Sequence, residues 1–134
     1  MSQENVEIVR RCNTAFNRGD REGALAFYHP EAEWRDLRHA PDTPERVHGL
    51  PALRALLEQW DAVFDDYTVE VEEYIDVGDC VVTVTRWLGQ GKESGLAIDL
   101  HTADVAEFAH GKIIRTTTGY ADKADALKAM GLSQ

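Results

Sequence analysis

One carboxylate stands in a row of uncharged positions, and it is the feature of this sequence best suited to acid–base chemistry. Alternate residues from Leu96 to Phe108 fall on one face of an expected strand, and Asp104 is the charged residue among them. Burying a carboxylate costs several kcal/mol unless the charge is paired or neutralised, so we expect the pKa of this acid to be raised. Functional acids often show such shifts. A bulge that turns Asp104 outward, or a buried structural hydrogen bond, explains the pattern equally well.

Asp36 is the second candidate acid. It ends an expected strand, Ala32–Asp36, in which period-two geometry places Ala32, Trp34 and Asp36 on the same face. An aspartate at this position also commonly caps the following loop, and taken alone Asp36 fits that role slightly better. Two carboxylates that converge in an apolar cavity could divide the roles of acid and base between them.

Other side chains offer weaker candidates. His101 lies on the opposite strand face from Asp104, and the remaining histidines sit in expected loops or turns without the spacing of a metal site. Trp87 and Tyr120 stand at strand ends, where aromatic residues serve a core or an interface more often than they stack on a ligand. We retain both, with Trp34, as candidate ligand contacts. No phosphate-binding loop, serine nucleophile motif or clustered cysteine site is recognisable, so we expect neither a metal nor a cofactor.

Helices dominate the first part of the chain. Apolar residues at helical spacing predict a first helix from Ser2 that ends at Gly19. Asp20 is a typical N-cap for a second, short helix, which we expect to include Phe27 and Tyr28 and to stop at His29-Pro30.

Between the first strand and the second half of the chain, one loop and one helix are expected. The segment Leu37–His48 contains two prolines and many charges, which predicts a loop at the rim of a pocket. Pro51 suits the first turn of a third helix, whose apolar stripe continues to Phe64.

The second half of the chain predicts strands. Alternation and β-branched residues indicate four of them, and Asp122 then caps a short C-terminal helix that closes at Gly131. The expected strands are Thr68–Asp76, Cys80–Gly89, Leu96–Phe108 and Lys112–Tyr120. Segregated helices and hairpin-linked strands predict an α+β fold with a largely antiparallel sheet.

Composition limits the possible partners. The 134 residues fit a single domain covering 1–134, and the net charge of −10 disfavours nucleic acid and anionic membranes. No segment resembles a signal peptide or a membrane span. Cys12 and Cys80 stand in apolar runs without metal-ligand spacing, which predicts reduced core thiols and a cytoplasmic location.

Four sequence motifs, in their order along nearly the whole chain, resemble those of the nuclear transport factor 2-like superfamily. They are Asn17-Arg18-Gly19-Asp20, Tyr28-His29-Pro30-Glu31-Ala32-Glu33-Trp34, Val47-His48-Gly49-Leu50-Pro51-Ala52-Leu53 and Phe108-Ala109-His110-Gly111-Lys112-Ile113. The closing segment is similar to SnoaL-like polyketide cyclases. The resemblance implies a cone: a curved sheet wrapped around the three helices of the N-terminal half, with a short C-terminal helix and a hydrophobic pocket. It also implies a homodimer formed by the strands Cys80–Gly89 and Lys112–Tyr120.

Ketosteroid isomerase, in the same superfamily, offers a residue-level comparison. Asp36 falls on its proton-shuttling base, and Asp104 falls on its protonated oxyanion-hole aspartate, although the nearby loop is one residue shorter in this chain. The oxyanion-hole tyrosine falls on Cys12, whose thiol is a poor donor. The resemblance therefore implies an acid–base pocket without implying steroid isomerisation.

Our leading hypothesis is cofactor-free acid–base chemistry of the isomerase or cyclase type on a small apolar carbonyl compound. Asp36 would move the proton, Asp104 would donate a hydrogen bond to the enolate oxygen, and Trp34 and Trp87 would wall the pocket. Cys12 and Tyr120 complete the candidate ligand contacts. A non-catalytic ligand-binding or dimerisation domain of the same fold is the alternative, and hydration of an epoxide or dehydration of an alcohol is a third possibility.

Overall fold

The computed structural model describes residues 2–38 and 44–131, which form four helices and six strands. The helices are α1 (Ser2–Asn17), α2 (Arg21–Leu25), α3 (Leu50–Val63) and α4 (Lys123–Ala129). The strands are β1 (Tyr28–Asp36), β2 (Arg46–His48), β3 (Phe64–Asp76), β4 (Cys80–Gly91), β5 (Ala97–Ala109) and β6 (Lys112–Tyr120). None of the helices in this part of the chain is long and apolar enough to cross a membrane.

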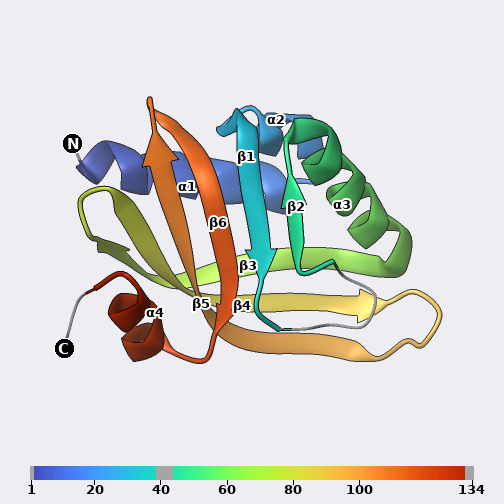
Figure 1. Cartoon of the computed structure of the whole chain (residues 1–134). Helices are drawn as coiled ribbons and strands as arrows, with labels where there is room; N and C mark the ends of the chain where they lie inside the picture. The colour runs from blue at the N-terminus through green and yellow to red at the C-terminus, as the bar shows by residue number, and fades with distance from the viewer. Residues whose placement is uncertain (1, 39–43, 132–134) are drawn as a thin grey trace.

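The strands make one curled, open sheet in the order β2-β1-β6-β5-β4-β3 (Figure 1). Neighbouring strands run antiparallel except for β1 and β6, which pair in parallel near the middle of the sheet. This arrangement brings the first strand beside the last, so the segments that carry Asp36 and Thr118 become direct neighbours. The α+β architecture with a mainly antiparallel sheet is thereby confirmed.

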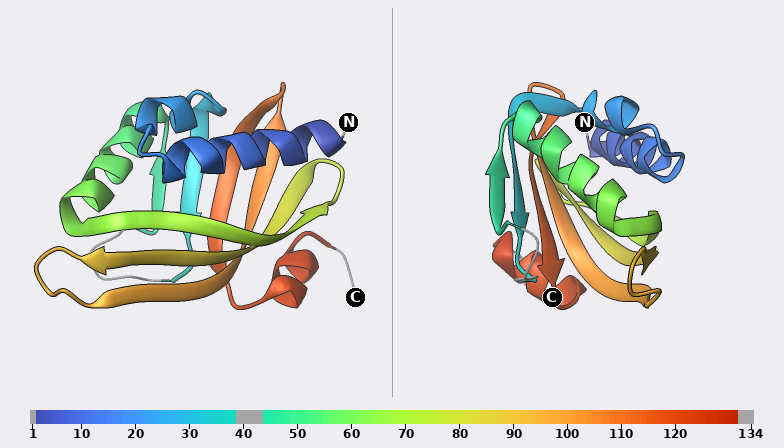
Figure 2. Two further views of the ribbon diagram at one scale, coloured as in Figure 1. Left: turned by 180° about the vertical axis from the view of Figure 1, so that it is seen from behind. Right: turned by 90° about the vertical axis from the view of Figure 1, so that its right-hand side faces the viewer.

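The sheet separates two apolar clusters. Helices α1 and α3 lie on its concave side (Figure 2), where they enclose the main core together with inward-facing strand residues such as Trp34 and Trp87. On the other face, Ala126 and Leu127 of α4 cover a smaller cluster that includes Val105. The C-terminal helix therefore covers part of the sheet face on which the expected homodimer contact through β4 and β6 would lie.

Local sequence explains where the short helices begin. The carboxylate of Asp20 accepts a hydrogen bond from the Gly23 backbone N–H at 2.8 Å, and Asp122 accepts one from the Asp125 N–H at 2.9 Å. Both are N-cap interactions that satisfy backbone donors without a partner inside the helix. Helix α3 has no such cap, but Pro51 in its first turn needs no acceptor.

The expectation that α2 includes Phe27 and Tyr28 is wrong. The helix ends at Leu25, and Tyr28 already begins β1, which continues through His29-Pro30. Pro30 is tolerated in this strand because the β1–β6 pairing is irregular between Tyr28 and Glu33. No regular backbone hydrogen bond to β6 is lost where Pro30 lacks an N–H. The inward face of Ala32, Trp34 and Asp36 is confirmed, since all three are buried.

Two further boundaries differ from the sequence expectation. Arg46–His48 lies in the segment expected to be a loop, but it forms the edge strand β2, which is too short and too charged to show a strand pattern. Residues 39–43 of that expected loop lie outside the described residues. The strand β3 begins at Phe64, four residues before the expected start and where the apolar stripe of α3 was expected to end.

Candidate functional site

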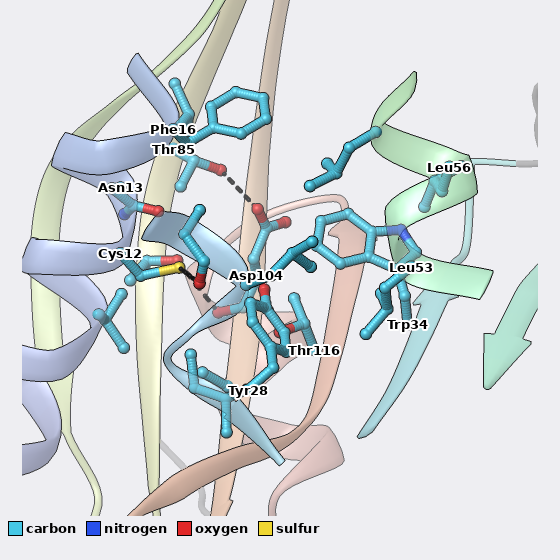
Figure 3. A pocket seen from close by; sticks show the side chains of 18 of the residues that line it. Cys12, Asn13, Phe16, Tyr28, Trp34, Leu53, Leu56, Thr85, Asp104 and Thr116 are labelled. Carbon is cyan, nitrogen blue, oxygen red and sulfur yellow. Dashed lines mark hydrogen bonds between the residues drawn. The ribbon is translucent and has the colours of Figure 1, made fainter. Parts of the chain in front are cut away.

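A cavity lies between the concave face of the sheet and the helices α1, α2 and α3 (Figure 3). Its volume, counted as the space open to the centre of a water molecule, is about 80 Å³. Since one water needs roughly 10–15 Å³ on that measure, the space would hold a few waters or a compact organic molecule. Apolar side chains make up most of the wall, and the polar ones are Cys12, Asn13, Tyr28, Thr83, Thr85, Asp104 and Thr116.

Three tryptophans form an aromatic wall. Trp34, Trp60 and Trp87 contact one another edge-to-face, with ring centroids 5.4 to 6.4 Å apart. Trp34 and Trp87, expected as ligand contacts, both lie on the wall of this cavity. Their indole N–H groups are buried, and neither has a hydrogen-bond partner among the described residues. An unsatisfied buried donor is costly, so an acceptor supplied by water or a ligand would stabilise this wall.

A bulge in β6 prepares the position of Asp104. At this point of the β5–β6 ladder, Thr118 and Gly119 together oppose the single residue Asp104. The extra residue frees the backbone N–H of Gly119 from the ladder, and Gly119 takes a φ of 102° that other residues rarely adopt. The outward-turning bulge considered from the sequence is not observed: the extra residue lies in the neighbouring strand β6, and Asp104 stays buried on the cavity side.

The two oxygens of the Asp104 carboxyl have different surroundings. Oδ1 accepts hydrogen bonds from the hydroxyls of Thr118 at 2.7 Å and Thr102 at 2.9 Å, and from the N–H of Gly119 at 3.1 Å. Near Oδ2 the hydroxyl of Thr85 lies at 3.1 Å, but that hydroxyl also lies 3.0 Å from the carbonyl of Thr102. Oδ1 therefore accepts three hydrogen bonds, whereas Oδ2 has one possible donor, the Thr85 hydroxyl, for which the Thr102 carbonyl competes.

The unequal number of donors at the two oxygens determines which oxygen of Asp104 would carry the proton when the carboxyl group is neutral. Asp104 is 6% exposed, and burial raises its pKa even though the hydrogen bonds from Thr118, Thr102, Gly119 and Thr85 oppose the shift. A proton on Oδ2 meets no competing donor, because Thr85 can turn its own hydroxyl to the Thr102 carbonyl. The site can therefore present a neutral carboxylic acid whose O–H is available to an acceptor.

Asp36 is buried, but its carboxylate is engaged by Arg38. Oδ1 accepts from the backbone N–H of Arg38 at 2.8 Å and from Nε at 3.0 Å, and Oδ2 accepts from Nη2 at 2.7 Å. Burial would lower the pKa of Arg38, but its hydrogen bond to Asp36 and its interaction with Tyr67 raise it, so the guanidinium stays charged. Among the described residues, Asp104 lines the cavity and Asp36 does not.

Cys12 and Tyr28 meet inside the cavity. The Cys12 thiol donates to the carbonyl of Ala24 at 3.5 Å, and burial raises its pKa to about 12. The phenol of Tyr28 lies beside this thiol and 3.3 Å from the hydroxyl of Thr116. Tyr28 was missed as a site residue because it was expected in a helix; its place four residues before Ala32, on the same parity, is the signal that could have indicated an inward side chain.

The remaining candidates lie elsewhere. Tyr120 packs beside α4 with the cluster on the other face of the sheet and is not among the cavity residues. His101 is exposed near Asp99, which also forms an ion pair with Arg86. Within residues 2–38 and 44–131, no three His, Cys, Asp or Glu side chains are arranged to hold a metal ion.

Solved structures of similar fold support this architecture. An NTF2-like protein from Burkholderia pseudomallei K96243 superposes with a TM-score of 0.80 at 21% identity, covering 93% of this chain and 95% of that chain. TerC, co-crystallised with polyporic acid, gives a TM-score of 0.78 at 21% identity over 96% and 97% of the two chains. A ketosteroid isomerase-like protein from Catenulispora acidiphila DSM 44928, in complex with trimethylamine, gives 0.75 at 17% identity over 94% and 93%. Identities this low show a shared fold.

Sequence comparison identifies the family. Comparison with curated proteins gave no match. The family model described as the SnoaL-like domain matches residues 9–116, which is well over half of the chain and includes every residue of the cavity wall. The expected resemblance is confirmed, and the chain belongs to the SnoaL-like family of the NTF2-like superfamily.

Proposed function

We propose that this protein binds a small, mostly apolar carbonyl compound and polarises its carbonyl oxygen with the protonated carboxyl of Asp104. The observation that carries the proposal is the buried acid on an apolar cavity wall, with Oδ1 saturated by three donors and Oδ2 left as the site of the proton. A neutral acid that donates toward developing negative charge stabilises an enolate in a site from which water is excluded.

The reaction that fits such a site is proton transfer next to the carbonyl group. Asp36 would take a proton from the adjacent carbon while Asp104 holds the oxygen, and return of the proton to another carbon would complete an isomerisation or a ring closure. Asp36 does not line the cavity in this structure, so it can act in this way only after its pair with Arg38 opens and its carboxylate turns into the cavity. Trp34 and Trp87 would exclude water, and no metal or cofactor is needed.

Two structural neighbours support a small-molecule role, since one was solved with polyporic acid and another with trimethylamine. The cavity of this chain is small, with room for a compact ligand. Among the described residues of its wall there is no Lys or Arg side chain, which favours a neutral ligand over an anion.

The second candidate is a non-catalytic ligand-binding or dimerisation domain. The pairing of Asp36 with Arg38 favours it, because a base held by three hydrogen bonds is not free to accept a proton. A homodimer would use the outer face of β4 and β6 beyond α4, and size-exclusion chromatography would test it, with a monomer at micromolar concentration as the contrary result. The buried, free thiols of Cys12 and Cys80 suit a reducing cytoplasm.

A titration of the carboxyl groups tests the proposed site. With ¹³Cγ-labelled aspartate, Asp104 should titrate above the ordinary aspartate range, and its resonance should shift when cyclohex-2-enone or acetophenone binds. An ordinary Asp104 pKa that no carbonyl compound changes would contradict the proposal. The signal is assigned with Asp104→Asn.

Deuterium exchange separates the enzyme from the binding domain. A catalyst of enolisation should speed the exchange of the ketone α-protons in D₂O, and both Asp36→Asn and Asp104→Asn should slow it. Binding of the ketone without any faster exchange would favour the non-catalytic role. The Glu70→Gln variant is a matched control, because Glu70 is an exposed carboxylate on the sheet away from the cavity.

A further inference from the structure

One phenol reaches the cavity near Asp104. Tyr28 extends from the start of β1, Asp104 extends from β5, and Thr116 of β6 lies between these two strands (Figure 3). The two groups are close enough for the charge of an ionised Asp104 to raise the pKa of Tyr28 further, beyond the main effect of burial. Both side chains therefore face the same space, and burial raises the pKa of each, which favours their neutral, hydrogen-donating forms.

The Tyr28 hydroxyl is weakly engaged in this structure. Its distance of 3.3 Å to the Thr116 hydroxyl lies beyond the usual O–H···O range of roughly 2.5–3.0 Å. Its other neighbour is the sulfur of Cys12, which is a weak acceptor. A phenol with such partners can turn toward a better acceptor and loses little by doing so.

Other cavity donors are less suitable. The Cys12 thiol is a weak donor and already points to the Ala24 carbonyl. The Thr85 hydroxyl belongs to the Asp104 network, and Thr83 lies near the backbone carbonyl of Asp104 at 3.5 Å. Asn13 is the remaining competitor, because its amide lies on the wall contributed by α1.

We propose that Tyr28 is a second catalytic donor, whose phenol shares the ligand's carbonyl oxygen with Asp104. This proposal rests on the proposed function and adds a residue to it. Position 12, on which the tyrosine of ketosteroid isomerase falls, is a cysteine in this chain. The phenol of Tyr28 reaches the same part of the cavity from a different element, the beginning of β1. One oxygen held by two neutral donors defines the ligand more narrowly: a compact, uncharged molecule whose carbonyl group points to the strands and whose apolar part contacts the tryptophan wall.

The carbonyl stretch of a bound ligand reports these hydrogen bonds directly. The probe is acetophenone labelled with ¹³C at the carbonyl, measured by isotope-edited infrared spectroscopy, and its affinity is followed through quenching of cavity tryptophan fluorescence. Tyr28→Phe should move the band to higher frequency and weaken binding about three- to tenfold, the effect of losing one hydrogen bond. Replacing Tyr28 by 3-fluorotyrosine, whose hydroxyl is a stronger donor, should move the band to lower frequency. This second variant tests the role of Tyr28 even if Tyr28→Phe folds poorly.

The controls separate the competing donors. Tyr74→Phe makes the same change outside the cavity, where the ring lies under Arg10, and should leave the band unchanged. A band that is unchanged in both Tyr28 variants, but shifted in Asn13→Leu or Cys12→Ala, overturns the role of Tyr28. If Asp104→Asn shifts the band and the Tyr28 variants do not, the proposed function survives without this residue. If neither acetophenone nor cyclohex-2-enone binds the unaltered protein, both proposals fail.

Discussion

Replacing Asp104 by asparagine substitutes a permanently neutral group of nearly the same shape for the carboxyl. The amide oxygen can take the position of Oδ1 and accept the hydrogen bonds from Thr118, Thr102 and Gly119. The NH₂ group then lies beside Thr85, whose hydroxyl can accept while donating to the Thr102 carbonyl. Asparagine therefore reproduces the hydrogen bonds of the protonated acid without a charge to bury.

The sign of the effect follows from the raised pKa of Asp104. Below about pH 3.9, the ordinary aspartate value, the side chain is protonated in both the folded and unfolded states. As the pH rises, the unfolded state releases its proton first, so the wild type loses stability relative to Asp104→Asn by up to about 1.4 kcal/mol per pH unit. This loss ends once the pH passes the folded-state pKa, and at pH 7 the variant should be the more stable protein.

Urea denaturation of both proteins from pH 4 to pH 8 measures this difference, and shared titrations cancel in the subtraction. Asp104→Ala is the contrasting variant, because it leaves buried donors unsatisfied at a cost of roughly 1–3 kcal/mol each. It should be destabilised by several kcal/mol at every pH. A difference between wild type and Asp104→Asn that does not change with pH, with the wild type more stable at pH 7, would show that Asp104 is ionised in the fold.

Two further substitutions test the surroundings of the two acids, and a labelling experiment tests the burial of Cys12. Gly119→Ala should lower the free energy of unfolding by at least about 1–2 kcal/mol, since φ is positive and a Cβ would lie 2.8 Å from Cγ of Arg38; an unchanged urea midpoint would contradict this. Arg38→Met should cost about 3–5 kcal/mol in urea denaturation by leaving the Asp36 carboxylate unpaired, and adding Asp36→Asn should restore part of the loss. Cys12, with its pKa raised to about 12, should resist a disulfide reagent at pH 8 in the native protein and react after unfolding; rapid native labelling at this residue would refute its burial as a thiol.

Much of the fold was predictable because its periodic patterns are strong. The stripe of α3 specifies both the helix and its buried face. The alternation in β5 specifies the strand, but residues 102–106 are buried on both faces, and Leu96 and Leu100 of the expected inward row are exposed. The errors fall where local signals conflict with tertiary pairing. His29-Pro30 is typical of a helix end, yet β6 pairs with the segment around it and makes it a strand. The strand β2 has three residues and owes its existence to its partner β1.

The candidate site was only partly predictable, for a related reason. The alternation of side chains along a strand places Asp104 on the inner face of its strand, and Trp34 and Asp36 on one face of theirs, without any knowledge of the partner strands. Parity cannot show that Arg38 turns back onto Asp36, because that contact depends on the conformation of the following turn. Nor can it show which face a helix will cover, so Tyr120 appeared as available to a ligand as Trp87 did.

A single bulge connects the two acids more closely than their separation in the sequence suggests. Thr118 pairs with Asp36 across the β1–β6 ladder while its hydroxyl donates to Asp104, and the N–H of Gly119 donates to Asp104 as well. The other side of Gly119 lies against the backbone and side chain of Arg38, the partner of Asp36. The same bulge therefore supplies two donors to Oδ1 of Asp104 and packs against the residue that pairs with Asp36. Because the two acids share this support, a substitution at Gly119 alters the surroundings of both.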